Sequence, residues 1–104
     1  MQNKQFTLRY LPLFHQDLLK TALYITDVSG NPDAAEKLID DVEKAILERL
    51  KYPTSFEPFH SCRKRKQVYY RILIRNYSVF YVVIDDVMEV RRFLYNQRNI
   101  DNIL

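Results

Sequence analysis

Hydrophobic and polar positions follow two different periods at the start of the chain. Apolar and polar side chains alternate over residues 5–10, which predicts a short β-strand that ends before Pro12. From about Leu13 the apolar positions recur every three to four residues: Phe14, Leu18, Ala22, Ile25 and Val28. This spacing predicts an amphipathic helix, and Gly30 is well placed to end it.

A second helix is predicted immediately after this glycine. Asn31 is a favourable helix cap, and Pro32 suits the first helical position. A second apolar stripe follows at helical spacing: Ala35, Leu38, Val42, Ala45 or Ile46, and Leu50. Pro53 closes this helix. Because the connection is so short, we expect the two helices to form an antiparallel hairpin.

The second half of the chain changes to a β-rich pattern. Residues 53–67 are predicted to form a loop. The runs 68–75, 78–84 and 87–94 are rich in β-branched and aromatic residues and are separated by short turn signals. They predict three consecutive antiparallel strands. The tail, 95–104, is polar with a few apolar residues at helical spacing.

The predicted element order is β-α-α-β-β-β, which indicates a single α+β domain over residues 1–104. We expect an antiparallel sheet with the N-terminal helical hairpin packed on one face. Since side chains alternate across a strand, Ile72 and Ile74 are assigned to the helices. Arg71 and Arg75 are then expected on the opposite, open face.

Length and composition exclude several classes of protein. A chain of 104 residues is too short for the large barrel and dinucleotide-binding folds. No apolar run is long enough to span a bilayer, and the N-terminus lacks the apolar core of a signal peptide, so we expect a cytoplasmic protein without membrane contact. Cys62 is the single cysteine, and two histidines do not complete a structural zinc site. No metal and no cofactor are expected.

Charge is distributed unevenly along the chain. Residues 1–50 carry 6 basic and 8 acidic side chains, whereas residues 51–104 carry 10 basic and 5 acidic ones. A positive field over the C-terminal half favours an anionic partner, either nucleic acid or an acidic protein.

Arginines and tyrosines dominate the candidate chemistry. They lie on or near the last strands: Tyr69, Arg71, Arg75, Arg92, Tyr95 and Arg98. Guanidinium groups can hold phosphates while tyrosine rings stack on unpaired bases, and metal-free RNA cleavage through the ribose 2′-hydroxyl fits this inventory. The basic run 63–66 on the preceding loop is a further candidate contact. The alternative is structural: Arg71 and Arg92 pair with Glu89 or cap helix carbonyls, and the tyrosines only pack.

Several short motifs, taken in order, resemble the RelE/ParE superfamily of toxins from type II toxin–antitoxin systems. They are NPDAAEKLID at 31–40, YRIL at 70–73, NYSVFYVV at 76–83 and VRRFLYNQRN at 90–99. The resemblance covers nearly the whole chain and agrees with the predicted order of elements. It implies a growth-inhibiting toxin that binds a cognate acidic antitoxin in a hetero-oligomer.

The resemblance also implies site residues. Arg71 matches the arginine of the second motif, Arg92 the arginine of the last strand, and Arg98 the arginine that follows. Tyr95 stands where many members carry histidine. We therefore predict catalytic roles for Arg71, Tyr95 and Arg98. Target-binding roles are predicted for four further residues: Lys64, Lys66, Arg75 and Arg92.

Members of this superfamily act on different targets, so three functions stay open. The first is cleavage of mRNA on the ribosome by a metal-independent endoribonuclease, and the second is non-enzymatic inhibition of DNA gyrase. The third is a degenerate member that only binds its antitoxin. Ser78 stands where RNA-cleaving members often carry a basic residue, and Asn99 stands where aspartate is usual.

Overall fold

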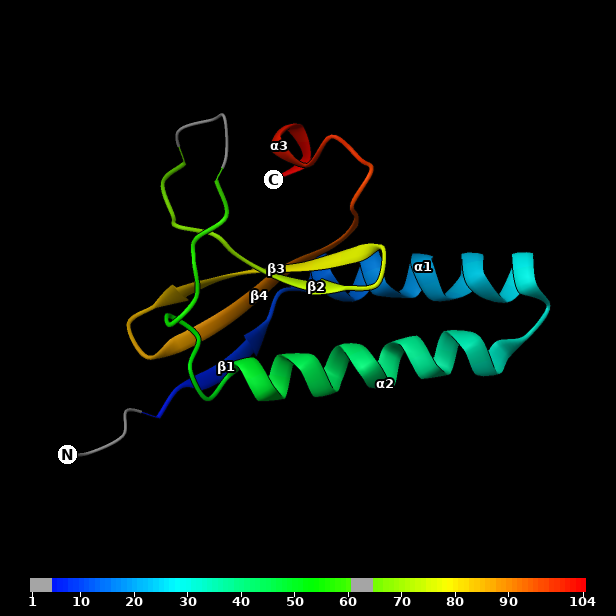
Figure 1. The fold of residues 1–104 in the computed structure, drawn as a ribbon, viewed down its shortest axis with the longest axis horizontal. Helices are drawn as coiled ribbons and strands as arrows, with labels where there is room; N and C mark the ends of the chain where they lie inside the picture. The colour runs from blue at the N-terminus through cyan, green and yellow to red at the C-terminus, as the bar shows by residue number, and fades with distance from the viewer. Residues whose placement is uncertain (1–4, 61–64) are drawn as a thin grey trace.

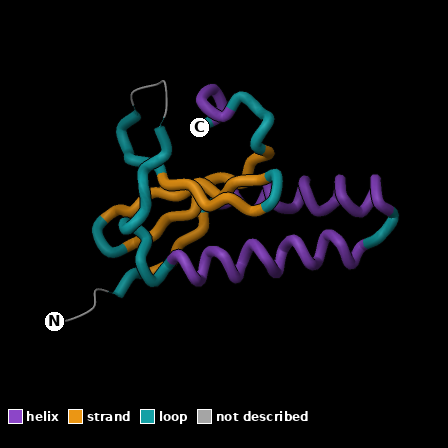
Figure 2. Tube along the Cα trace, viewed as in Figure 1, coloured by secondary structure: helices purple, strands orange, loops and turns teal. Residues whose placement is uncertain are grey.

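A computed structural model describes residues 5–60 and 65–104. The elements are β1 (Thr7–Tyr10), α1 (Pro12–Ser29), α2 (Pro32–Arg49), β2 (Tyr70–Ile74), β3 (Tyr77–Ile84), β4 (Val87–Tyr95) and α3 (Ile100–Ile103). The predicted order is confirmed, and the apolar residues of the tail form the short helix α3. Figures 1 and 2 show the hairpin of α1 and α2 extending well past the edge of the sheet.

Local signals end and begin the two long helices where the sequence predicts. Gly30 follows α1 with φ 67°, a left-handed conformation that glycine adopts without a Cβ clash. Asn31 then caps α2, because its side-chain oxygen accepts a hydrogen bond from the backbone N–H of Asp33 at 3.0 Å. Pro32 occupies the first turn of α2. The end of α1 and the start of α2 therefore lie within a few residues of each other, so α2 folds back along α1.

The four strands form one sheet in the order β1-β4-β3-β2. β2, β3 and β4 make the predicted antiparallel meander. β1, however, pairs with β4 in parallel, with Thr7 beside Val87 and Tyr10 beside Val90. The sheet is therefore mixed, whereas a wholly antiparallel sheet was expected from the sequence. A parallel pair needs a long crossover, and the helical hairpin with β2 and β3 supplies it.

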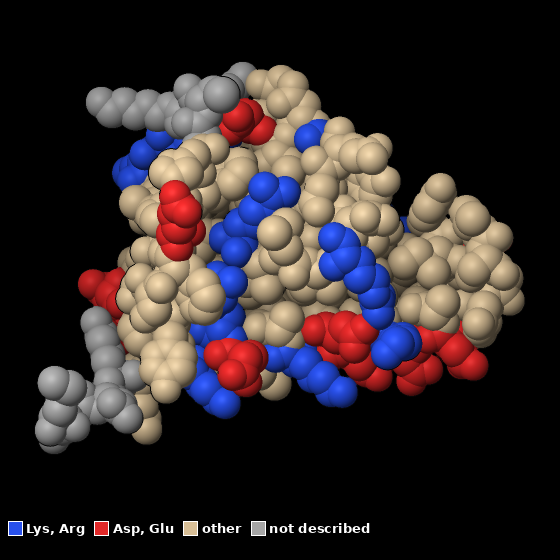
Figure 3. Space-filling model, in the orientation of Figure 1, with Lys and Arg blue, Asp and Glu red and all other residues tan. Residues whose placement is uncertain are grey.

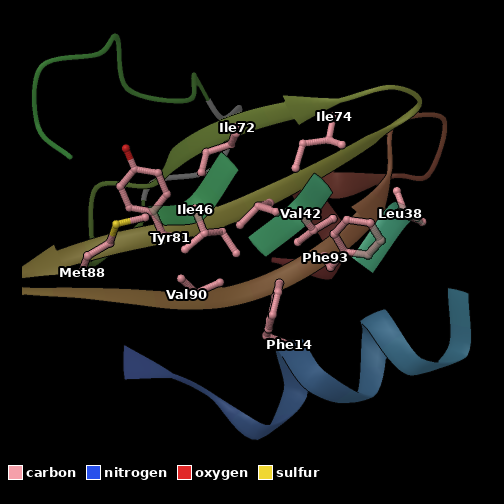
Figure 4. Close-up of a cluster of buried hydrophobic side chains, with 11 residues drawn as sticks. Phe14, Leu38, Val42, Ile46, Ile72, Ile74, Tyr81, Met88, Val90 and Phe93 are labelled. Atoms are coloured by element: carbon pink, nitrogen blue, oxygen red, sulfur yellow. The ribbon is translucent and has the colours of Figure 1, made fainter. Parts of the chain in front are cut away.

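One face of the sheet packs on the helical hairpin and holds the main core. Ile72 and Ile74 face α2 as predicted, and Figure 4 shows their side chains pointing toward its apolar stripe. Fully buried residues of this layer include Leu38, Val42, Ile46, Val79, Tyr81, Met88 and Val90. Burial of so many large side chains is the main source of stability of the fold.

The opposite face of the sheet is partly covered, although the helices leave it free. Phe80 and Leu94 are buried there beneath Ile100 of α3. Phe59 and Tyr69 from the preceding loop pack on the same cluster. The face that the helices leave free is thus covered at its apolar centre by the tail and the loop. Neither long helix is apolar enough to cross a membrane, and the same holds for α3.

Candidate functional site

Arg71 lies on the sheet face opposite the helical hairpin, as predicted. Its Nε donates a hydrogen bond to Ser78 Oγ at 2.7 Å, and its Nη2 donates to Asn96 Oδ1 at 3.1 Å. Ser78 is fully buried and itself donates to Asn96 Oδ1 at 2.5 Å. The guanidinium also lies 5.7 Å from the centre of the Phe80 ring. Arg71 is thus held in place by a polar network that joins β2 to β3 and to the segment that follows β4.

Tyr95 lies on the other face of the sheet. Its ring meets Tyr77 edge-on with centroids 5.5 Å apart, and Tyr77 stacks on Phe93 at 5.1 Å. Phe93 belongs to the core beneath the helices. Burial, together with neighbouring Tyr95 and Tyr24, raises the pKa of Tyr77. The predicted proton-transfer residue and Arg71 are therefore separated by the sheet.

Arg98 lies in the exposed segment between β4 and α3. Its backbone N–H donates to the carbonyl of Tyr95 at 3.1 Å, which closes a turn. Lys66 is likewise exposed on the loop before β2. Within residues 5–60 and 65–104, neither side chain makes an ion pair or hydrogen bond. Both cations remain available to a partner. Lys64, predicted to bind the target, lies outside the described residues.

Arg75 and Arg92 are each held by a carboxylate from a helix. Arg75 lies in the β2–β3 turn with φ 55° and pairs with Asp41 of α2. Its expected position on the open face is wrong, because the left-handed backbone turns the side chain back toward the helices. Arg92 donates to both carboxylate oxygens of Asp17, at 2.7 and 3.0 Å.

The Asp17–Arg92 pair closes the exposed edge of β4. β1 pairs with β4 only as far as Val90. Beyond that point Asp17 Oδ2 accepts a hydrogen bond from the backbone N–H of Phe93 at 3.1 Å. The side chains of Asp17 and Arg92 are only 11% and 17% exposed. A carboxylate from α1 thus replaces the missing strand, which gives Arg92 a structural role beside any role in target binding.

A second network, on the sheet face opposite the helical hairpin, was not predicted from the sequence. The β3–β4 register shifts between Phe80 and Tyr81, so β4 carries an extra residue, Arg91. The shift places Arg91 on the same side as Arg92, where it donates to Glu89 at 2.8 Å and to the Tyr69 hydroxyl at 3.1 Å. Two adjacent arginines in a strand, Arg91 and Arg92, are a signal that could have indicated this irregularity.

Glu89 is the buried centre of that network. Its side chain is 7% exposed and accepts hydrogen bonds from both Arg9 and Arg91, with Arg9 Nε at 2.8 Å. Burial raises the pKa of the carboxyl, but the hydrogen bonds and positive charges of Arg9 and Arg91 lower it more, so the net shift is downward. Glu89 remains ionised and fixes both arginines.

Arg49 was also missed, and it joins α2 to the edge of the sheet. It donates to the Tyr81 hydroxyl at 2.9 Å and to the carbonyl of Arg71 at 3.3 Å. Its guanidinium lies 3.5 Å from the centre of the Phe56 ring. Burial raises the pKa of Tyr81, although Arg49 acts against that shift. The segment after α2 is thereby fastened over β2, next to Arg71.

The charged surface and the groove described below lie in different parts of the molecule. Figure 3 shows Lys and Arg in a band across the sheet and Asp and Glu gathered along α2. A shallow groove of about 580 Å³ lies elsewhere, lined by Gln5, Phe6, Leu47, Leu50, Lys51, Tyr52, Thr54 and Ser55. None of the predicted site residues lines it.

No cluster of three or more His, Cys, Asp or Glu side chains within the described ranges could hold a metal ion.

Two comparisons with known proteins gave matches. Residues 8–100 match the model of a family described as "ParE toxin of type II toxin-antitoxin system, parDE". A solved structure titled "Chromosomal ParDE TA system from P. aeruginosa" superposes with a TM-score of 0.73 and 12% sequence identity, covering 88% of this chain and 97% of that one. At this identity the superposition shows a shared fold. A search of curated proteins found no match.

Proposed function

Since the chain belongs to the ParE toxin family of type II toxin–antitoxin systems, we propose that it inhibits growth by binding a protein target and not by cleaving RNA. DNA gyrase is the target that the family resemblance suggests. A cognate antitoxin is the partner that neutralises it. Binding is the second of the three functions that the sequence left open.

The separation of Arg71 from Tyr95 carries this proposal. General acid–base cleavage needs a proton-transfer group and a phosphate-binding cation around the same phosphate, within hydrogen-bond reach. Arg71 donates to Ser78 and Asn96 on one face, whereas Tyr95 packs against Tyr77 on the other. Of the three predicted catalytic residues, Arg71 and Tyr95 therefore face opposite sides of the sheet and do not meet at one phosphate in this arrangement.

The surface around Arg71 suits the binding of a protein. Leu73 lies two residues further along β2 on the same face and is 66% exposed. Val68 and Phe56 near this edge are 58% and 47% exposed, and Arg49 links Phe56 to β2. Apolar side chains mixed with arginines are typical of protein interfaces.

The test is controlled expression of the chain alone in bacteria, with mRNA 5′ ends mapped and gyrase supercoiling measured on purified protein. We expect growth arrest without new breaks in translated messages, together with loss of supercoiling activity. Tyr95→Phe should retain toxicity, because its hydroxyl takes no part in binding. Leu73→Asp should reduce toxicity at least tenfold, whereas the same change at Leu47, which is also exposed and lies on α2, should not.

Copurification with the antitoxin serves as the folding control for each variant. New in-frame breaks that disappear in Tyr95→Phe would overturn the proposal in favour of mRNA cleavage. Absence of any growth effect would leave only a chain that binds its antitoxin.

A further inference from the structure

The outward face of α1 is unusually apolar for a surface helix. Leu19, Leu23, Tyr24 and Val28 are between 57% and 69% exposed. The inward stripe of the same helix is apolar as well, since Phe14 and its helical neighbours pack against α2 and β4. Neighbouring exposed apolar side chains on one face of a protein are typical of a site where another molecule binds. The outward side chains therefore indicate a surface that another molecule covers.

Two opposite charges interrupt this apolar face. Lys20 and Asp27 are both exposed and stand seven residues apart, two helical turns, which places them in one line along the helix. Neither forms an ion pair or hydrogen bond with any residue in the described parts of the chain. The face thus carries one unpaired cation and one unpaired anion at a fixed separation of about 10 Å, given a rise of about 1.5 Å per residue.

The spacing of these residues is self-complementary. We propose that α1 pairs with α1 of a second copy in antiparallel orientation, about a two-fold axis between Leu23 and Tyr24. In that register Lys20 faces Asp27 of the second copy, and the symmetry repeats the pair. Leu23 then meets its own symmetry mate on one side of the ion pairs, and Tyr24 meets its mate on the other. A shift by one turn brings like charges closer and removes both pairs.

The position of α1 allows this contact. Figure 1 shows the distal half of the α1–α2 hairpin projecting beyond the sheet. Arg71, Leu73 and Arg98 lie on the sheet or its far loop and are not part of it. The proposed pairing is therefore independent of the proposed target-binding surface, and either can fail without the other.

The test is sedimentation equilibrium of the full chain, purified free of antitoxin, at concentrations up to about 100 µM. The wild type should reach twice the 12.6 kDa chain mass. Lys20→Asp and Asp27→Lys should each weaken the dimer at least tenfold, since each replaces two attractive pairs by two repulsive ones. An equimolar mixture of these two variants should dimerise again, because the mixed pair restores both attractions.

Controls separate this interface from others. Lys44→Asp, an exposed charge reversal on α2, should leave the dimer unchanged, and Leu23→Asp should abolish it. Thermal unfolding confirms that each variant is folded. A monomeric wild type would overturn the proposal. So would a dimer that is insensitive to the α1 charges, or a mixture of the two reversed variants that remains monomeric.

Discussion

The two faces of the sheet are built from different chemistry. The face toward the hairpin is a continuous apolar layer in which Tyr81 carries one of the few polar atoms, and that hydroxyl donates to the carbonyl of Pro53 at 2.7 Å. The opposite face has a small apolar cluster around Phe80, surrounded by arginine networks centred on Ser78 and Glu89.

The contrast shows that the two faces of one sheet are held by different kinds of interaction. Burial of apolar area is non-directional and supplies most of the folding free energy. Networks of charged hydrogen bonds add less net stability, but they fix side chains in defined directions. The hairpin face therefore holds the fold together, and the networks on the opposite face keep the arginine side chains in fixed positions.

The largest expected effect lies in the apolar layer. Leu38→Ala removes a fully buried side chain of α2 and leaves a cavity, so we expect the free energy of unfolding to fall by about 3 kcal/mol. Chemical denaturation measures this change. Leu73→Ala, on the exposed part of the other face, should change it by less than about 0.5 kcal/mol. Equal effects would show that the two faces contribute alike.

A smaller loss is expected where the edge of β4 is closed by a side chain. Asp17→Ala leaves Arg92 and the Phe93 N–H without their acceptor in a mostly buried place, which should cost about 2 kcal/mol. Asp40→Ala on the exposed side of α2 is the matched control. Hydrogen exchange at Phe93 should increase selectively in the first variant, and unchanged protection there would contradict the role given to Asp17.

The Glu89 network should make the arginine face sensitive to acid. The pKa of Glu89 is lowered in the folded state, so its stabilising contribution is present above its unfolded pKa and is lost as the pH falls through the folded value. Glu89→Gln should lower stability by about 1.5 kcal/mol near neutral pH. Denaturation at several pH values should show this difference shrinking toward acid pH. A difference that is independent of pH would point to packing alone.

The smallest effect on the free energy of unfolding is expected at the β2–β3 turn. Asp41→Ala removes the partly exposed partner of Arg75, and pairs near the surface contribute no more than about 0.5 kcal/mol. The same substitution should leave growth inhibition unchanged, because Arg75 points toward the helices. Reduced toxicity without reduced stability would return Arg75 to the target-binding residues.

Much of the fold could be predicted because its signals are local. The Gly30–Asn31–Pro32 junction and the alternation around Ile72 each act within a few residues, and both are confirmed. The candidate site was harder to predict. Strand alternation placed Arg71 correctly, but the same rule failed for Arg75, where the turn has a left-handed backbone. The roles predicted for Arg71, Tyr95, Arg98 and the basic loop stay predictions.

The sequence by itself determined the elements, their order and the sheet face that meets the helices, because periodicity and caps are properties of neighbouring residues. Only the tertiary structure decided that β1 runs parallel to β4, that Asp17 reaches Arg92, and that Arg9 reaches Glu89. These partners are 75 to 80 positions apart in the chain. Their meeting depends on how the hairpin crosses the sheet, which no local pattern records.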